Sequence, residues 1–201
     1  MNILIASLLL FAALTGMAQA AGSIEAGQGK SVVCGACHGV DGNSVLPNFP
    51  KIAGQGERYL VEQLRAIKRG DRVVPKMMAF MPALSDQDIQ DLAAYYAAQK
   101  HSIGAADPAL VAAGELLYRG GQPEQGVPAC TGCHSPEGVG NAQAGFPLLS
   151  GQHAAYTAKQ LRAYRQGRRT TDGEAMIMRS IARRLSDTDI AALATYIEGL
   201  H

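Results

Sequence analysis

The pattern Cys-x-x-Cys-His occurs twice in the chain, at residues 34–38 and at residues 130–134, and it uses all four cysteines. This pattern is the attachment signature of c-type haem, because two thiols at this spacing can reach the two vinyl groups of one porphyrin. The histidine that follows lies under the macrocycle, where an imidazole nitrogen can bind the iron. The chain therefore predicts two covalently bound haem c groups. The attachment residues are Cys34, Cys37, Cys130 and Cys133.

Four cysteines can also form two disulfide bonds, and two CxxC pairs can hold one zinc ion. Neither alternative gives a purpose to the histidine that follows each pair. A short-range disulfide needs no histidine, and a zinc ion held by four thiolates needs no further ligand. The haem interpretation accounts for every residue of both motifs, with His38 and His134 as iron ligands.

The first twenty residues differ from the rest of the chain. Residues 3–14 are almost continuously apolar, and Ala18-Gln19-Ala20 is a small-x-small cleavage site. We expect a secretory signal peptide, residues 1–20, that is cleaved after Ala20, although no Lys or Arg precedes the apolar run. The alternative is an uncleaved membrane anchor, for which the apolar run is short. Export agrees with the haem prediction, because c-type haem is attached outside the cytoplasm.

Cleavage leaves roughly 180 of the 201 residues, enough for one domain or two small ones. The chain has 18 basic and 17 acidic residues, and this balance gives no case for a nucleic-acid-binding protein. It has no Trp and 4 Phe, and small domains bury little apolar core. A covalently attached porphyrin can supply the missing apolar centre of each domain.

The chain repeats itself around the two motifs. Three stretches recur, and residues 48–55 align with 145–152, residues 59–66 with 156–163, and residues 83–89 with 184–190. This is a tandem duplication with one haem motif in each copy, and the unit is far too long for a solenoid repeat. The boundary is expected between His101 and Pro108. It gives an N-terminal domain over residues 21–104 and a C-terminal domain over residues 105–201.

Both halves have helical periodicity without a convincing alternating strand pattern, so we expect an all-α protein. The expected first and middle helices cover residues 25–33 and 57–69 in the first half and residues 110–119 and 154–167 in the second, and the last helix of each half is expected to follow Ser85 and Ser186. Ser85 and Ser186 each begin a capping signature. Gly27 and Gly114 occupy matching positions and predict a close crossing of the first and last helices of each half. The alternative is a frayed helix end that tolerates glycine.

A haem iron held by one histidine has an open sixth position, and its occupant separates an electron carrier from a catalyst. The methionine candidates are Met77, Met78 and Met81 in the first half and Met176 and Met178 in the second. Counted back from the aligned caps, only Met77 and Met178 are methionine in both copies. We therefore predict the axial pairs His38/Met77 and His134/Met178. Met78 and Met176 are close enough to substitute, and methionine is also a common core residue.

Other recurring or clustered residues have open roles. The tyrosines paired across the repeat are expected to pack or hydrogen-bond in the haem pocket, and they are Tyr59, Tyr95, Tyr156 and Tyr196. The histidines without a counterpart are expected to be surface or hydrogen-bonding residues, and they are His101, His153 and His201. Pro50 and Pro147 either pack on the porphyrin or shape a turn. Seven arginines between residues 162 and 184 either form a solvated face, or pair with propionates and dock an acidic partner.

The chain resembles the cytochrome c4 family, the diheme class of small bacterial cytochromes c, over its whole mature length. The stretches that carry the resemblance are residues 33–39, 48–51, 54–59, 129–134, 151–156 and 176–179. The resemblance implies two tandem class I cytochrome c domains packed face to face, with haem edges close enough for electron exchange. It implies the same two axial pairs. One departure is the stretch from Gly70 to Met77, which is shorter than the family pattern.

The resemblance further implies a one-electron carrier of the periplasm, loosely associated with the membrane, rather than an enzyme. Its partners would be an upstream quinol-oxidising complex or dehydrogenase and a downstream haem-copper terminal oxidase, with weak and transient docking. One alternative is the electron-accepting diheme subunit of a flavocytochrome c sulfide dehydrogenase. A second is a diheme peroxidase, which would need an open iron site and a distal acid–base group.

Overall fold

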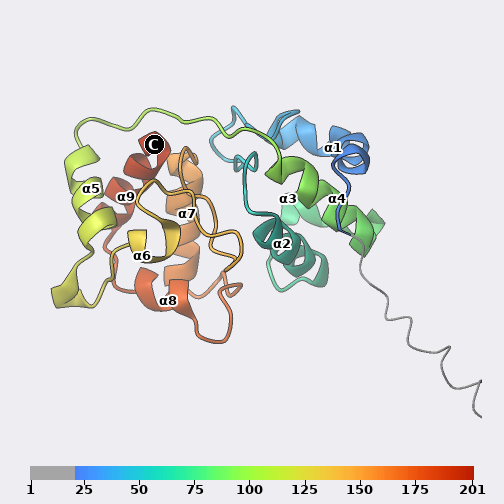
Figure 1. Cartoon of the computed structure of the whole chain (residues 1–201). Helices are drawn as coiled ribbons and strands as arrows, with labels where there is room; N and C mark the ends of the chain where they lie inside the picture. The colour runs from blue at the N-terminus through green and yellow to red at the C-terminus, as the bar shows by residue number, and fades with distance from the viewer. Residues whose placement is uncertain (1–20) are drawn as a thin grey trace, which may run out of the picture.

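Figure 1 shows the computed structural model of the chain, which describes residues 21–201. The expected signal peptide lies outside the described residues. The N-terminal half contains α1 (Ile24–His38), α2 (Glu57–Arg69), α3 (Pro75–Met78), the 3-10 helix η1 (Met81–Ala83) and α4 (Asp86–Ala97). The C-terminal half contains α5 (Val111–Gly120), the 3-10 helix η2 (Pro123–Gln125), α6 (Thr131–His134), α7 (Ala154–Arg165), α8 (Ile177–Ala182) and α9 (Asp187–Gly199). Residues 21–201 contain isolated β-bridges but no strand, which confirms the all-α prediction.

Local sequence signals explain where several helices begin and end. Ser85 and Asp88 form a complete capping box at the start of α4, and Ser186 and Asp189 form the same box at the start of α9. Each box satisfies backbone N–H groups that have no partner within the helix. Helix α2 ends at Gly70, which adopts the left-handed conformation that glycine tolerates best. These boundaries agree with the sequence predictions.

The first and last helices of each half cross at a glycine. A Cβ atom at Gly27 of α1 would lie 2.0 Å from the carbonyl oxygen of Asp91 in α4. A Cβ atom at Gly114 of α5 would lie 2.3 Å from the carbonyl oxygen of Ala192 in α9. Both distances are far inside van der Waals contact, so only glycine allows the two backbones to approach this closely. The predicted close crossing is confirmed in both halves.

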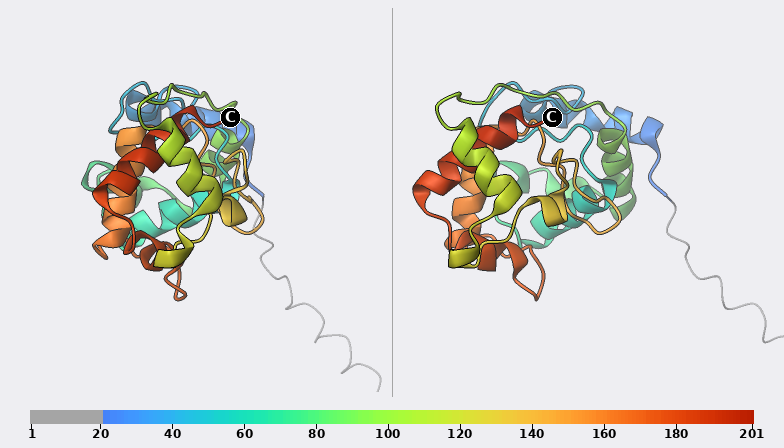
Figure 2. Two further views of the ribbon diagram at one scale, coloured as in Figure 1. Left: turned by 90° about the vertical axis from the view of Figure 1, so that its left-hand side faces the viewer. Right: turned by 60° about the vertical axis from the view of Figure 1, so that its left-hand side comes forward.

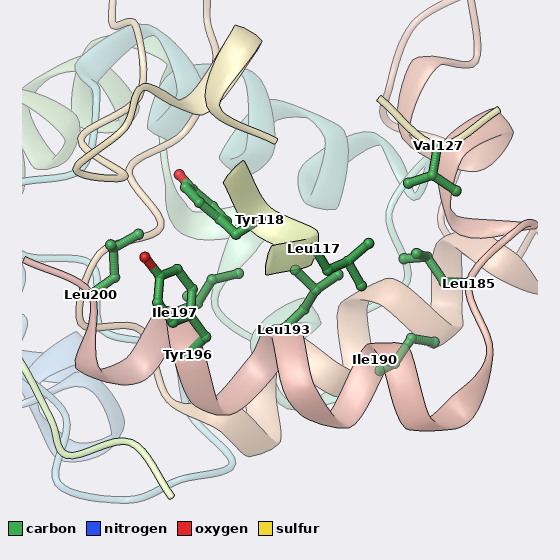
Figure 3. Packing of buried hydrophobic residues seen from close by; sticks show 9 residues of the cluster. All are labelled: Leu117, Tyr118, Val127, Leu185, Ile190, Leu193, Tyr196, Ile197 and Leu200. Atoms are coloured by element: carbon green, nitrogen blue, oxygen red, sulfur yellow. The ribbon is translucent and has the colours of Figure 1, made fainter. Parts of the chain in front are cut away.

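Each half has its own apolar core beside its first and last helices. Figure 3 shows the core of the C-terminal half, in which Leu117 and Tyr118 of α5 face the apolar side of α9. The core of the N-terminal half is smaller and consists of Leu60, Leu92, Ala93, Tyr95 and Tyr96. The first cysteine of each motif packs against the core of its own half. The cores therefore position both attachment sites.

The two halves lie side by side and are joined by a linker, residues 98–110, that runs along one edge of both (Figure 1 and the right panel of Figure 2). The Ser102 amide donates a hydrogen bond to Asn43 Oδ1 of the N-terminal half at 2.8 Å. The Gly104 amide donates to the Glu198 carbonyl oxygen of the C-terminal half at 2.9 Å. The linker is thus bound to both halves. Between residues 21 and 201, no helix combines the length and the apolar character that a membrane span requires.

Candidate functional site

In the N-terminal half the CxxCH motif forms the end of one long helix. The sequence predicted a first helix ending near residue 33, but α1 continues through Cys34 and Cys37 to His38. Gly39 ends the helix with φ of 81°, and its amide donates to the Gly35 carbonyl oxygen at 2.9 Å. The helix is longer than predicted because the motif packs against the core and because this glycine supplies a well-bonded end.

In the C-terminal half the motif lies on a helix of its own. Helix α5 ends at Gly120, and a loop that contains η2 separates it from α6. Cys130 directly precedes α6, and Cys133 and His134 lie within it. The His134 amide donates to the Cys130 carbonyl oxygen at 2.9 Å, which closes one helical turn around the motif. Both halves therefore present two thiols and one imidazole on helical backbone.

The two motif histidines have the same environment. His38 Nδ1 lies 2.9 Å from the Pro50 carbonyl oxygen, and His134 Nδ1 lies 3.0 Å from the Pro147 carbonyl oxygen. A carbonyl only accepts, so Nδ1 carries the proton in both rings and the lone pair of Nε2 remains for a metal. Each histidine is 7% exposed. The two prolines thus orient the histidines through their carbonyl groups.

Burial also keeps these imidazoles neutral. It lowers the pKa of His38 and of His134, and the hydrogen bond to the proline carbonyl opposes this shift only in part. A neutral imidazole is the form that binds iron. Among residues 21–201 neither Nε2 atom has a hydrogen-bond partner, so both rings are available as ligands. The residues of both motifs therefore fit a covalently attached haem.

The alternative uses of the cysteines find no support. All four thiols are free, so neither motif forms a disulfide. Across the described residues no group of three or more His, Cys, Asp or Glu is arranged to hold a metal ion, so the two CxxC pairs do not meet at one zinc site. Burial raises the pKa of Cys34, and it raises that of Cys130 to about 11. These thiols are protonated at neutral pH and are not activated nucleophiles.

The methionines differ in exposure. Met77 in α3 and Met178 in α8 are half-buried, whereas Met78 is 45% exposed and Met176 is 41% exposed. Met81 is 4% exposed and belongs to the apolar interior. The pair singled out by the repeat is thus intermediate in burial in both halves, as a side chain at the edge of a cofactor site would be.

The paired tyrosines differ in their hydrogen bonds, and the Tyr196 hydroxyl accepts from Arg119 Nε at 3.2 Å. The Tyr95 hydroxyl donates to the Val40 carbonyl oxygen, two residues after the first motif, at 3.0 Å. Tyr59 and Tyr156, which we expected in the haem pocket, place their hydroxyls on arginines of the opposite half. Tyr118 was missed by the sequence analysis because it has no counterpart in the repeat. Its hydroxyl donates to the Ser135 carbonyl oxygen at 2.8 Å, directly after the second motif.

Two guanidinium groups lie in the interface between the halves. Arg72 Nη2 donates to the Tyr156 hydroxyl and Arg169 Nη2 donates to the Tyr59 hydroxyl, each at 2.8 Å. Both arginines also donate to Gln63 Oε1. The repeat relates the members of this cluster in pairs, which are Tyr59 and Tyr156, Gln63 and Gln160, and Arg72 and Arg169. Within residues 21–201 neither guanidinium forms a salt bridge, so neutral oxygens of both halves solvate the buried charge of Arg169 and the half-buried charge of Arg72.

The arginines of the second half therefore have several roles rather than one. Arg169 is 5% exposed and belongs to the interface. Arg165 pairs with Asp187 at 2.7 Å on the surface, and Arg179 pairs with the buried Asp172 carboxylate at 2.7 Å. Arg169 and Arg179 are therefore used inside the molecule rather than on a solvated face.

The histidines outside the motifs are hydrogen-bonded, as predicted. His153 is 8% exposed and its Nε2 lies 2.7 Å from the Ser44 carbonyl oxygen of the opposite half. His101 Nε2 lies 3.3 Å from Ser150 Oγ, and His201 is exposed. His153 is thus a further contact between the halves.

Comparison with known proteins places this geometry in context. The family model for cytochrome c matches residues 24–99 and 111–201, once in each half. The cytochrome c4 of Pseudomonas aeruginosa is 62% identical over 201 residues, which cover 100% of both chains. The crystal structure of reduced recombinant cytochrome c4 from Pseudomonas stutzeri has a TM-score of 0.89 and 62% identity, and the match covers 90% of this chain and 100% of that chain.

A more distant relative has a different description. The thiosulfate dehydrogenase electron acceptor of Stutzerimonas stutzeri is 36% identical over 171 residues, which cover 83% of this chain and 78% of that protein. Similarity to cytochrome c4 over the full length, at much higher identity, does not favour the alternative of a subunit of a flavocytochrome c sulfide dehydrogenase.

Proposed function

The chain belongs to the cytochrome c4 family of diheme electron-transfer cytochromes, and from this premise we propose that it is a one-electron carrier of a bacterial respiratory chain. The observation that carries the proposal is the pair of equivalent histidines. Each is buried, neutral and held by a proline carbonyl with Nε2 available, and each follows a pair of free thiols.

In each half, different residues would attach the porphyrin and bind its iron. The motif cysteines would hold the porphyrin through thioether bonds, and His38 and His134 would each bind its iron through Nε2. We assign the second axial ligands to Met77 and Met178, which are supported by their equivalence in the repeat and by their intermediate burial. When bound, each haem supplies an iron that changes between the ferric and ferrous states by one electron.

Two occupied axial positions suit a carrier better than an enzyme. With both positions filled by protein side chains, no substrate needs to bind the metal. The proline carbonyls hold the imidazoles in one orientation, which limits the rearrangement that accompanies a change of charge. A thioether ligand favours the ferrous state and raises the reduction potential.

The cellular setting belongs to the same proposal. After removal of residues 1–20 the mature protein would act in the periplasm, loosely associated with the membrane, with domains over residues 21–104 and 105–201. An upstream quinol-oxidising complex or dehydrogenase would reduce it, and a haem-copper terminal oxidase would oxidise it. Reoxidation of the reduced protein by a purified terminal oxidase would test the downstream partner directly.

The ligand assignment is tested by the visible and near-infrared spectrum of the oxidised holoprotein. We expect a weak methionine-to-ferric charge-transfer band that loses about half its intensity in Met77→Ala and about half in Met178→Ala, because the two sites are equivalent. Met78→Ala and Met176→Ala are the matched controls and should leave the band intact.

Two results would contradict the proposal. A band unchanged in Met77→Ala or in Met178→Ala would show that the ligand of that half is another residue. A wild-type spectrum with only one methionine-ligated haem, together with carbon monoxide binding to the reduced protein at neutral pH, would show an open iron site. A diheme peroxidase would then be the better interpretation.

A further inference from the structure

Two glutamines cross the interface between the halves in a reciprocal way. Gln152 Oε1 of the C-terminal half accepts a hydrogen bond from the Lys51 amide at 2.9 Å, and its Nε2 donates to the Lys51 carbonyl oxygen at 2.7 Å. Gln55 Oε1 of the N-terminal half accepts from the Leu148 amide at 2.8 Å, and its Nε2 donates to the Leu148 carbonyl oxygen at 3.0 Å. Each side chain thus binds one backbone residue of the other half through two hydrogen bonds.

Each of these contacts ends on the peptide group that holds a motif histidine. The Lys51 N–H and the Pro50 carbonyl belong to one peptide unit, and that carbonyl binds His38 Nδ1. The Leu148 N–H and the Pro147 carbonyl form the equivalent unit beside His134. A peptide unit is planar, so an atom that fixes the N–H also fixes the direction of the carbonyl.

The glutamines are well suited to this task. Gln55 is 5% exposed and Gln152 is 9% exposed, so water does not compete for either amide. A backbone N–H only donates and a backbone carbonyl only accepts, which fixes the orientation of each side-chain amide. Both residues follow a glycine at a matching position of the repeat, Gly54 and Gly151, each with positive φ. The same device therefore occurs once in each half and acts on the other.

We propose that Gln55 and Gln152 are positioning residues that tune the reduction potential of the haem in the opposite half. Consecutive hydrogen bonds polarise one another, so a glutamine oxygen on the peptide N–H makes the proline carbonyl a stronger acceptor. A stronger acceptor on Nδ1–H makes the imidazole a more electron-rich ligand, which stabilises the ferric iron. Gln152 then lowers the potential of the His38 haem, and Gln55 lowers that of the His134 haem.

This inference rests on the proposed function, because it concerns the potentials of two histidine-ligated haems. It adds a dependence of each haem on the other half of the molecule. The contact reaches the iron through one peptide unit and one imidazole, so its effect should be specific to one haem. A general loosening of the interface would instead affect both haems.

The test is a redox titration of the holoprotein followed by proton NMR, in which the signals of each haem are assigned through their contacts with residues of the same half. In Gln55→Leu the ratio of reduced to oxidised His134 haem at a fixed potential should rise about threefold, or roughly 30 mV for a one-electron couple. The His38 haem should change by less than half as much. Gln152→Leu should give the mirror result.

Gln63→Leu is the matched control, because Gln63 is a buried interface glutamine, 7% exposed, that contacts arginines rather than a haem-binding peptide. It should shift neither haem selectively. If a leucine variant fails to incorporate haem, Gln55→Met and Gln152→Met, which keep the length and flexibility of the side chain, replace it.

The outcomes separate the inference from the proposed function. The inference is wrong if a variant shifts only the haem of its own half, shifts both haems equally, or shifts neither. The proposed function would still hold in these cases, provided that the wild type has two methionine-ligated haems. If the wild type lacks those haems, the proposed function fails before any variant is compared.

Discussion

The two halves carry the same motif on different backbone. In the N-terminal half one helix of 15 residues, α1, contains the whole motif, whereas in the C-terminal half a helix of 10 residues, α5, stops and a helix of 4 residues, α6, carries the motif. The histidine nevertheless binds its proline carbonyl at 2.9 Å in one half and 3.0 Å in the other. The hydrogen bond of the motif histidine is therefore the same in the two copies, whereas the helix that contains the motif differs between them.

The crossing of the first and last helices differs as well. In the N-terminal half Lys30 of α1 binds Asp88 and Asp91 of α4, with the Asp88 contact at 2.7 Å. At the positions that correspond to Lys30 and Asp91 the C-terminal half has Leu117 and Ala192, both buried. One crossing is partly ionic and the other is apolar. The two halves should therefore respond differently to mutation and to pH.

The largest expected effect tests the feature that both crossings share. Gly27→Ala and Gly114→Ala should each lower the free energy of unfolding of their own half by about 3 kcal/mol, because the new Cβ would overlap a backbone carbonyl. Hydrogen exchange of peptides from each half, measured by mass spectrometry, reports the two effects separately. Gly29→Ala is the control, since no atom beyond the neighbouring backbone of its own helix lies within 4 Å of its Cβ position, and it should stabilise α1 by up to about 1 kcal/mol. A mild effect at Gly27 or Gly114 would show that the crossing can widen.

The ionic crossing should make the N-terminal half sensitive to acid. Hydrogen bonds from Lys30, and to a smaller extent from the Ser23 amide and Gln87, lower the pKa of the Asp91 carboxyl to about 2. An unfolded aspartate titrates near pH 4, so the stabilisation is complete above that pH and is lost as the pH falls through about 2.

The matching variant is Asp91→Ala, which should lower the free energy of unfolding at pH 7 by about 2 kcal/mol, because three donors lose a charged acceptor. In this variant the free energy of unfolding of the N-terminal half should fall less on acidification than it does in the wild type. Acid titrations followed by hydrogen exchange in each half would measure both quantities. Equal acid sensitivity of the two halves in the wild type would contradict the comparison.

The capping boxes should give a smaller and equal effect in both halves. Ser85 Oγ and Ser186 Oγ each accept from the amide three residues later at 3.1 Å, and each serine amide donates to an aspartate at 2.8 Å. Ser85→Ala and Ser186→Ala should each cost about 1 kcal/mol in denaturant unfolding. A clear difference between the two variants would mean that the surrounding half, and not the local capping box, determines how much the cap stabilises the protein.

The smallest effect concerns the residue after each motif histidine. Gly39 has φ of 81°, and Ser135 has φ of 66° at the equivalent position, where a side chain is strained. Ser135→Gly would relieve this strain but would also remove the hydrogen bond that Ser135 Oγ accepts from the Val139 amide at 3.0 Å. We expect a change within about 0.5 kcal/mol in thermal unfolding, because the two terms oppose each other. A larger gain in stability for Ser135→Gly would show that relief of the backbone strain outweighs the lost hydrogen bond.

Local and repeated features of the chain were predictable. The capping serines and the end of α2 depend on residues within a few positions of one another, whereas the glycine crossings were indicated by glycines at matching positions of the repeat. The structure reproduces all of them. The extension of α1 through Cys34 to His38 was not predicted, since the motif has weak helical periodicity and its helix depends on contact with the core. The separate helix α6 was missed for the same reason.

The sequence by itself determined that the chain holds two haem motifs on two related helical halves, because each motif is a short pattern whose chemistry depends on spacing alone. Only the tertiary structure decided how the halves meet. Gln152 binds Lys51 across 101 residues and Gln55 binds Leu148 across 93, and neither glutamine differs in periodicity or polarity from a surface residue. Their role depends on which backbone groups the other half brings within hydrogen-bonding distance, and that follows from the packing of whole domains.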